Sequence, residues 1–196
     1  HVYPKNEAID VEKSVQEQKV NGYGVGSLVK FPVSSELATL DAKSHYKYFQ
    51  LKDTLDARLS EVTATEVTIE GASLETTDYT VAVDGQTVTV TFTASGLAKL
   101  KDAATKTVSA TFQGKVTSIT DGNIKNTAQL LTDTQYGPVP DTPPDTPPTP
   151  PNPPTSPEVQ THWGDLTVHK VDADHTDAGL AGATFQVYNA TDPYAD

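Results

Sequence analysis

A proline-rich segment constrains the fold of this chain more than any other feature of its sequence. Of the 14 prolines, all but three fall between residues 138 and 157. Proline cannot donate a backbone hydrogen bond to a helix or sheet, so residues 136–160 (YGPVPDTPPDTPPTPPNPPTSPEVQ) are predicted to form neither. The repeated PP pairs favour a stiff polyproline II spacer of about 3.1 Å per residue, with a ligand for a proline-recognising domain as the alternative. This spacer would separate residues 7–135 from residues 161–196.

The segment before the spacer shows the alternation that is typical of β-strands. In DYTVAVDGQTVTVTFTA, apolar side chains recur at every second position on both sides of Asp84-Gly85. The pattern predicts two strands joined by a primed turn, which needs positive φ. SLVKFPV, EVTIEG and TVSATFQGKVTSI are further predicted strands, and only SGLAKLKDAA has helical spacing, with Ser95 as its candidate N-cap. Many short strands with one short helix predict an all-β sandwich.

The composition excludes several classes of function. A net charge of −12 without a basic patch argues against nucleic-acid binding, because phosphates require clustered Lys and Arg. No apolar run in this segment is long enough to span a membrane, and no Ser-His-Asp arrangement can be argued. The chain has no cysteine, so disulfides, which often stabilise small secreted domains, cannot form here. An extracellular location would therefore require another source of stability.

Three polar residues of the first domain occupy positions that alternation turns inward. Lys13 shares a predicted strand face with flanking valines, Asp53 with flanking leucines, and Asn126 with an isoleucine and an alanine. Each is costly to bury alone, but together the three can satisfy one another. The alternative is that the lysine extends its amine to solvent and that the asparagine, which follows a glycine closely, lies in a turn.

Buried together, these side chains can react. Burial lowers the pKa of a lysine and raises the pKa of an aspartic acid, and a neutral amine is a nucleophile. Attack of the Lys13 amine on Cγ of Asn126, with loss of ammonia, would leave an amide bond across the sandwich, and Asp53 would shuttle the proton. The reaction needs proximity and a dry site, so we expect no cofactor.

Several stretches of residues 7–135 carry a family resemblance: VEKSV, YGVGSLVKFPV, YFQLKDTLDARL, DYTVAVDGQTVTVTFTASGLAKL and GNIKNTAQL. Together they resemble the CnaA-type isopeptide-forming domain of Gram-positive surface pilins. The resemblance implies an immunoglobulin-like β-sandwich in which Lys13 and Asn126 form the intramolecular bond. It also implies that Asp53 is the catalytic proton shuttle.

Residues 161–196 contain the stretch GDLTVHKVDADHTDAGLAGATFQVY, which resembles the opening strands of a CnaB-type β-sandwich. Lys170 holds that family's bond-forming position, but its partner cannot be identified in this chain. The acidic turn of Asp172, Asp174 and Asp177 offers oxygens of the kind that calcium prefers. It lacks the Gly and Glu of an EF-hand loop, so a solvated turn is predicted.

The first residues, HVYPK, resemble the end of the pilin motif, to which we assign residues 1–6. In backbone pilins the lysine of this motif attacks the acyl-enzyme of a pilin-class sortase and joins successive subunits, and Lys5 holds that position. The resemblance implies a secreted, wall-attached shaft subunit, with identical pilin subunits and minor or tip pilins as its partners. Apart from one self-directed reaction, we expect no enzymatic turnover.

Two other functions stay open from the sequence. One is a minor or tip pilin, or a wall-anchored adhesin, that presents a head for a host-surface ligand. A shaft subunit would need Lys5, whereas an adhesin with a separate head would not. The other is a carbohydrate-binding sandwich, which would show an exposed aromatic stripe that the eight tyrosines do not convincingly form.

Overall fold

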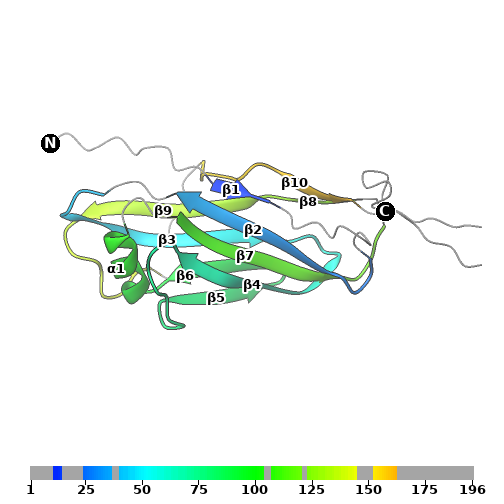
Figure 1. The fold of residues 1–196 in the computed structure, drawn as a ribbon, viewed down its shortest axis with the longest axis horizontal. Helices are drawn as coiled ribbons and strands as arrows, with labels where there is room; N and C mark the ends of the chain where they lie inside the picture. The colour runs from blue at the N-terminus through cyan, green and yellow to red at the C-terminus, as the bar shows by residue number, and fades with distance from the viewer. Residues whose placement is uncertain are drawn as a thin grey trace, which may run out of the picture.

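Two antiparallel sheets form the body of the protein (Figure 1). The computed structural model describes residues 11–14, 24–36, 40–103, 107–120, 123–144 and 152–162. The elements are β1 (Val11–Lys13), β2 (Leu28–Glu36), β3 (Ser44–Thr54), β4 (Leu59–Ile69), β5 (Tyr79–Asp84), β6 (Thr87–Phe92), α1 (Ala94–Asp102), β7 (Thr107–Val116), β8 (Asn123–Asn126), β9 (Ala128–Tyr136) and β10 (Val159–His162). One sheet has the order β1-β2-β7-β4 and the other β5-β6-β3-β9. The predicted all-β fold with one short helix is confirmed.

The core consists of apolar side chains that alternate along the strands and face the opposite sheet. Phe49 contacts Tyr46 and Phe92 edge to face, with ring centroids 5.7 and 5.4 Å away. Phe31 and Phe112 lie opposite each other on β2 and β7, and both are fully buried. Aromatic pairs of this kind contribute about 0.5–1.5 kcal/mol beyond their burial. Any polar group that faces inward therefore enters dry, apolar surroundings.

The β5–β6 hairpin has its turn one residue later than the sequence predicts. The ladder closes at Asp84, so Gly85 and Gln86 form the turn, and Gly85 has a φ of 58°, as a primed turn requires. Val83 lies opposite Val88, yet Val83 is 50% exposed while Val88 is buried. Strand β5 is the edge strand of its sheet, so fewer side chains cover it. Alternation therefore predicts the face on which Val83 lies but not whether that side chain is buried.

Helix α1 is capped by Thr93, so the prediction of Ser95 as the N-cap is wrong. The backbone of Thr93 is extended, and its hydroxyl accepts a hydrogen bond from the Gly96 amide. Since the helix begins at Ala94, Ser95 already lies in the first turn. Its hydroxyl instead donates to the carboxylate of Asp78 at 2.7 Å.

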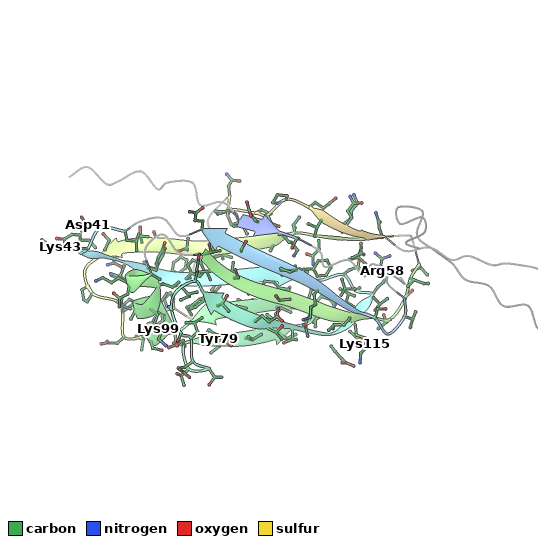
Figure 2. All side chains as sticks on the ribbon, viewed as in Figure 1. Asp41, Lys43, Arg58, Tyr79, Lys99 and Lys115 are labelled. Carbon is green, nitrogen blue, oxygen red and sulfur yellow. The ribbon has the colours of Figure 1, made fainter. Side chains whose placement is uncertain are left out.

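Asp78 fastens α1 to the loop that precedes β5. Its buried carboxylate accepts hydrogen bonds from the Glu75 amide at 2.7 Å and from the Lys99 ammonium at 2.6 Å. Lys99 belongs to α1, where Figure 2 labels it. Burial acts to raise the pKa of Asp78, but the bonds from Lys99, Glu75 and Ser95 together bring it below its usual value. Gly96 packs directly on the Asp78 carbonyl, so the helix sits close to this loop.

Pro32 in β2 ends the ladder between β1 and β2. The Ser14 amide donates to the Pro32 carbonyl at 3.0 Å, but proline has no N–H with which to return the bond. The β1–β2 ladder therefore ends at Lys13, opposite Val33. This places Lys13 at the end of an edge strand.

The last part of the proline-rich segment lies on the first domain. The sequence predicts a spacer over residues 136–160, whereas residues 152–160 contact β8 and β9. The Leu130 amide donates to the Pro154 carbonyl at 2.9 Å, and from Val159 onward the chain pairs with β8 as β10. The proline residues can accept hydrogen bonds at their carbonyl oxygens but cannot donate any. A strand forms from Val159 onward, where every residue again has a backbone N–H to donate.

Gly96→Ala should destabilise the domain, because a Cβ at this position meets the Asp78 carbonyl and lies 2.7 Å from the Phe92 ring. Overpacking costs about 1–3 kcal/mol, of which the better helix propensity of alanine returns up to about 1 kcal/mol. Urea denaturation measures the net loss. Gly24→Ala is the control, because among the described residues nothing lies within 4 Å of a Cβ there. Equal losses in both variants would contradict this account of α1 docking.

Candidate crosslinking site

Lys13 points into the core from the edge of its sheet. Alternation along β1 turns Val11 and Lys13 inward and leaves Glu12 exposed, and the Lys13 side chain is completely buried. Its Nζ lies 5.0 Å from the centre of the Phe31 ring and 5.9 Å from that of Phe112. Burial lowers the pKa of Lys13 although the nearby Asp53 acts to raise it.

Asp53 meets the lysine from the other sheet. It lies near the end of β3, opposite Val88 of β6 and Ala128 of β9, and its side chain is also fully buried. Lys13 donates a hydrogen bond to Oδ2. Burial raises the pKa of Asp53, and the charge and hydrogen bond of Lys13, with a smaller effect of Asn126, oppose that rise. Burial therefore favours the neutral amine and the neutral acid.

Asn126 completes the cluster from the last position of β8. It is 3% exposed and lies two residues before Ala128, which pairs with Asp53 in the β3–β9 ladder. Its amide acts to lower the pKa of Asp53. Within the described part of the chain, neither polar atom of its side chain completes a hydrogen bond, nor does Oδ1 of Asp53. A buried carboxamide without a partner is costly and calls for an explanation. This one lies beside the acid that holds the Lys13 amine.

The structure thus gathers the three predicted site residues from β1, β3 and β8. An amine, an acid and a carboxamide in a dry core are the groups that an amide-forming exchange requires. The sequence reasoning missed the aromatic rings of Phe31 and Phe112, which surround the amine. Both rings lie in predicted strands, but nothing local in the sequence relates them to Lys13.

The sequence reasoning also missed Arg58, which holds the backbone at Thr120 and at Asn123, the first residue of β8. Its guanidinium donates to the carbonyl oxygens of Thr120 and Asn123, the latter at 2.6 Å. It also donates to the Asp56 carboxylate at 2.8 Å, and these hydrogen bonds lower the pKa of Asp56. Figure 2 shows Arg58 at the end of the sandwich opposite α1. Its carbonyl partners are 62 and 65 residues further along the chain, which no local pattern reveals.

Several predicted residues cannot be placed. Lys5, Lys170 and the acidic turn of Asp172, Asp174 and Asp177 lie outside the described residues, so their roles stay predictions. In the ranges that are described, no three His, Cys, Asp or Glu side chains are grouped to hold a metal ion. The helix of the described chain is too short and too polar to cross a membrane.

The fold places the chain among the β-sandwich domains of pili and fimbriae, as solved structures show. The Actinomyces fimbrial adhesin FimA matches with a TM-score of 0.75 and 64% identity, over 80% of this chain and 58% of that one. The major pilin SpaD from Corynebacterium diphtheriae matches with a TM-score of 0.62 and 25% identity, over 79% of this chain and 34% of that one.

A family model for the Sgo0707 N2 domain matches residues 10–139, and the chain belongs to this family. Fimbrial subunit type 2 of Actinomyces naeslundii is 54% identical over 203 residues, an alignment that covers all of this chain. The chain spans 38% of the length of that relative.

Lys13→Met should make the domain lose stability as pH rises above about 4, the ordinary pKa of aspartic acid. The substitution removes the amine that lowers the pKa of Asp53 and leaves the burial that raises it. The folded state then keeps a proton that the unfolded chain has released, so rising pH favours unfolding until the raised pKa is passed. Urea denaturation between pH 4 and pH 8 measures this slope.

The control for this slope is Lys13→Met combined with Asp53→Asn, which lacks the titrating carboxyl. The double variant should show no such fall between pH 4 and pH 8. The same slope in both proteins would mean that Asp53 is not the group responsible.

Proposed function

We propose that this chain is part of a structural pilus subunit whose first domain forms an internal isopeptide bond between Lys13 and Asn126. The observation that carries the proposal is the buried Lys13–Asp53 contact beside a carboxamide that makes no hydrogen bond to any described residue. Similarity to a fimbrial subunit and to pilin structures supports the role in a pilus.

The reaction follows from the protonation states that burial favours. The Lys13 ammonium passes a proton to Asp53 and becomes a nucleophile. Its Nζ attacks Cγ of Asn126, and the protonated carboxyl of Asp53 hydrogen-bonds the amide oxygen as negative charge develops there. The C–N bond to the side-chain nitrogen then breaks after that nitrogen has received the second proton of the amine through Asp53. The products are a secondary amide and ammonia. Asp53 still holds the first proton and returns to the carboxylate when the departing ammonia takes that proton up as ammonium.

Such a bond would supply what a chain without cysteine lacks. It would tie β1, the shortest of the described strands, to β8 and close a loop of more than a hundred residues. Closing a loop of this size stabilises a fold by about 4–5 kcal/mol in the chain-entropy account. Unlike a disulfide, an amide cannot be reduced. The ladder that holds β1 has only three residue pairs among the described residues. With the bond in place, a load applied at the N-terminal end would be carried by a covalent bond and not by this short ladder alone.

We assign the chain to the shaft of a sortase-assembled pilus on the cell wall. Lys5 would accept the acyl group of the neighbouring subunit from a pilin-class sortase, and identical subunits together with minor or tip pilins would be the partners. The domain would not turn over substrate, because its reaction uses up its own side chains. In the second domain, Lys170 would be the bond-forming lysine, with a partner that the sequence does not identify.

One observation favours a second function. The similar structure from Actinomyces is a fimbrial adhesin, so the same sandwich could carry a head that binds a host-surface ligand. Use of Lys5 by a sortase separates the two functions. In a shaft, the Lys5 amine of each subunit must be joined to the neighbouring subunit, whereas an adhesin with a separate head does not need this lysine.

The intact mass of the denatured chain tests the crosslink. The mass should fall short of the sequence by one ammonia, and digestion should yield a peptide that joins Lys13 to Asn126. Asp53→Ala should restore the full mass and lower the melting temperature while the domain still folds. Asp78→Ala is the matched control, because it removes another buried carboxylate that pairs with a lysine, and it should retain the deficit. A wild-type mass equal to the sequence would refute the bond.

Lys5→Arg should abolish covalent polymers when the chain, within its full-length subunit, is incubated with a pilin-class sortase. Arginine keeps the charge but is not nucleophilic at neutral pH. The internal bond should form as before, as the intact mass would show. Lys43→Arg, at an exposed lysine labelled in Figure 2, should leave the polymer ladder unchanged. Ladders that persist in Lys5→Arg would assign the acceptor to another lysine.

A further inference from the structure

The strand that carries Asn126 pairs with the end of the proline-rich segment. Strand β8 belongs to neither main sheet, and within the described ranges its one strand partner is β10. The register places Val159 opposite Asn126 and Thr161 opposite Ile124, and Figure 1 shows β10 running alongside β8. We call residues 152–162 the docking segment.

Two buried hydroxyl groups of the docking segment fix the backbone on either side of Asn126. On one side, the Ser156 hydroxyl accepts a hydrogen bond from the Ala128 amide at 2.9 Å, and the Ser156 amide donates to the Ala128 carbonyl at 2.8 Å. On the other side, the Thr161 hydroxyl accepts from the Ile124 amide at 3.1 Å. Ser156 is 5% exposed and Thr161 2%, so water cannot readily replace these hydroxyl groups.

Ser156 also connects the docking segment to the proton shuttle. Its partner Ala128 lies opposite Asp53 in the β3–β9 ladder. One residue of the segment therefore sets the backbone next to both the acid and the carboxamide. By contrast, the contact between Glu158 and Lys125 at 3.2 Å joins two exposed side chains, and such surface pairs contribute little. Beside the β8–β10 ladder, the buried hydroxyls are the side-chain contacts of the docking segment with the backbone on either side of Asn126.

The attack of an amine on a carboxamide depends on the placement of the reacting atoms and on the exclusion of water. The side chain of Asn126 makes no hydrogen bond within the described residues, so its position is set by its backbone and by packing. Without the docking segment, the amides of Ile124 and Ala128 lose these partners and the edge of β8 opens to water. The carboxamide would then be hydrated and free to turn away from Lys13.

We propose that the docking segment positions Asn126 for attack by Lys13, so that the first domain closes its crosslink rapidly only after the chain has emerged as far as His162. The inference rests on the proposed isopeptide reaction. It makes Ser156 and Thr161 positioning residues, since neither touches the reacting atoms. It also couples bond formation in one domain to synthesis of the chain that leads to the next.

The test is the rate at which newly made full-length chain loses ammonia. Chain is produced in a cell-free system, and samples are quenched in denaturant and weighed by mass spectrometry. Thr161→Val keeps the shape of the side chain but removes the acceptor for the Ile124 amide, and it should slow the reaction roughly tenfold, as expected for one buried donor left without a partner. Thr161→Ser keeps the acceptor and should react at close to the wild-type rate.

Ser156→Ala should slow the reaction to a similar extent. Thr155→Ala is its control, because the Thr155 hydroxyl is exposed and bonds to Pro153 within the segment itself, and it should react normally. Each substitution is also placed in an Asp53→Ala background, where thermal melting shows that the uncrosslinked domain folds.

Each outcome of the test decides between the hypotheses. Equal rates for Thr161→Val and wild type would overturn the positioning role and leave the crosslink standing. Equal slowing by Thr161→Val and Thr161→Ser would also overturn it, because the loss would then come from packing and not from the hydrogen bond. A wild-type chain that never loses ammonia would refute the proposed function, and this inference with it.

Discussion

The contact between Lys13 and Asp53 is the constraint on which the rest of the structure depends. Removing an ammonium group from water costs several kcal/mol, so the fold must give the amine a partner or neutralise it. It does both, because Asp53 lies within hydrogen-bonding distance and the rings of Phe31 and Phe112 exclude water. The same apolar surroundings that make the contact costly also favour the uncharged amine. The cost of burial and the capacity to react therefore have one cause.

A second lysine–aspartate pair in the same domain shows how strongly burial decides such chemistry. Lys99 and Asp78 are also in contact, but the Lys99 side chain is one-third exposed (33%). The pKa of Asp78 is lowered, so the pair remains ionic and fastens α1 to its loop. The pKa of Asp53 is raised because both members of its pair are fully buried. Identical residue types thus serve as a structural tie at one position and as a candidate proton-transfer pair at the other.

The end of the proline-rich segment packs on the first domain and does not act as a free spacer. A free spacer would let neighbouring domains move independently. Instead, residues 152–162 contact β8 and β9, and Val159 packs against the core. In the proposed pilus subunit, tension from the C-terminal side would therefore reach β10 first, and the hydrogen bonds of β10 to β8 would share the load with the candidate crosslink.

The sequence by itself determined most of the strands and which of their side chains face inward. Both follow from a period of two, which is a property of the strand alone, so Lys13, Asp53 and Asn126 could be singled out before their neighbours were known. Tertiary structure decided the rest, because it depends on contacts between distant segments. Val83 obeys the alternation yet is exposed at a sheet edge, Arg58 finds its carbonyl partners more than sixty residues away, and the segment after the prolines becomes a strand because β8 offers it an unpaired edge. Local periodicity determines the direction in which each side chain points. Its burial, its pairing and its reactivity depend on which distant residues the fold places in contact with it.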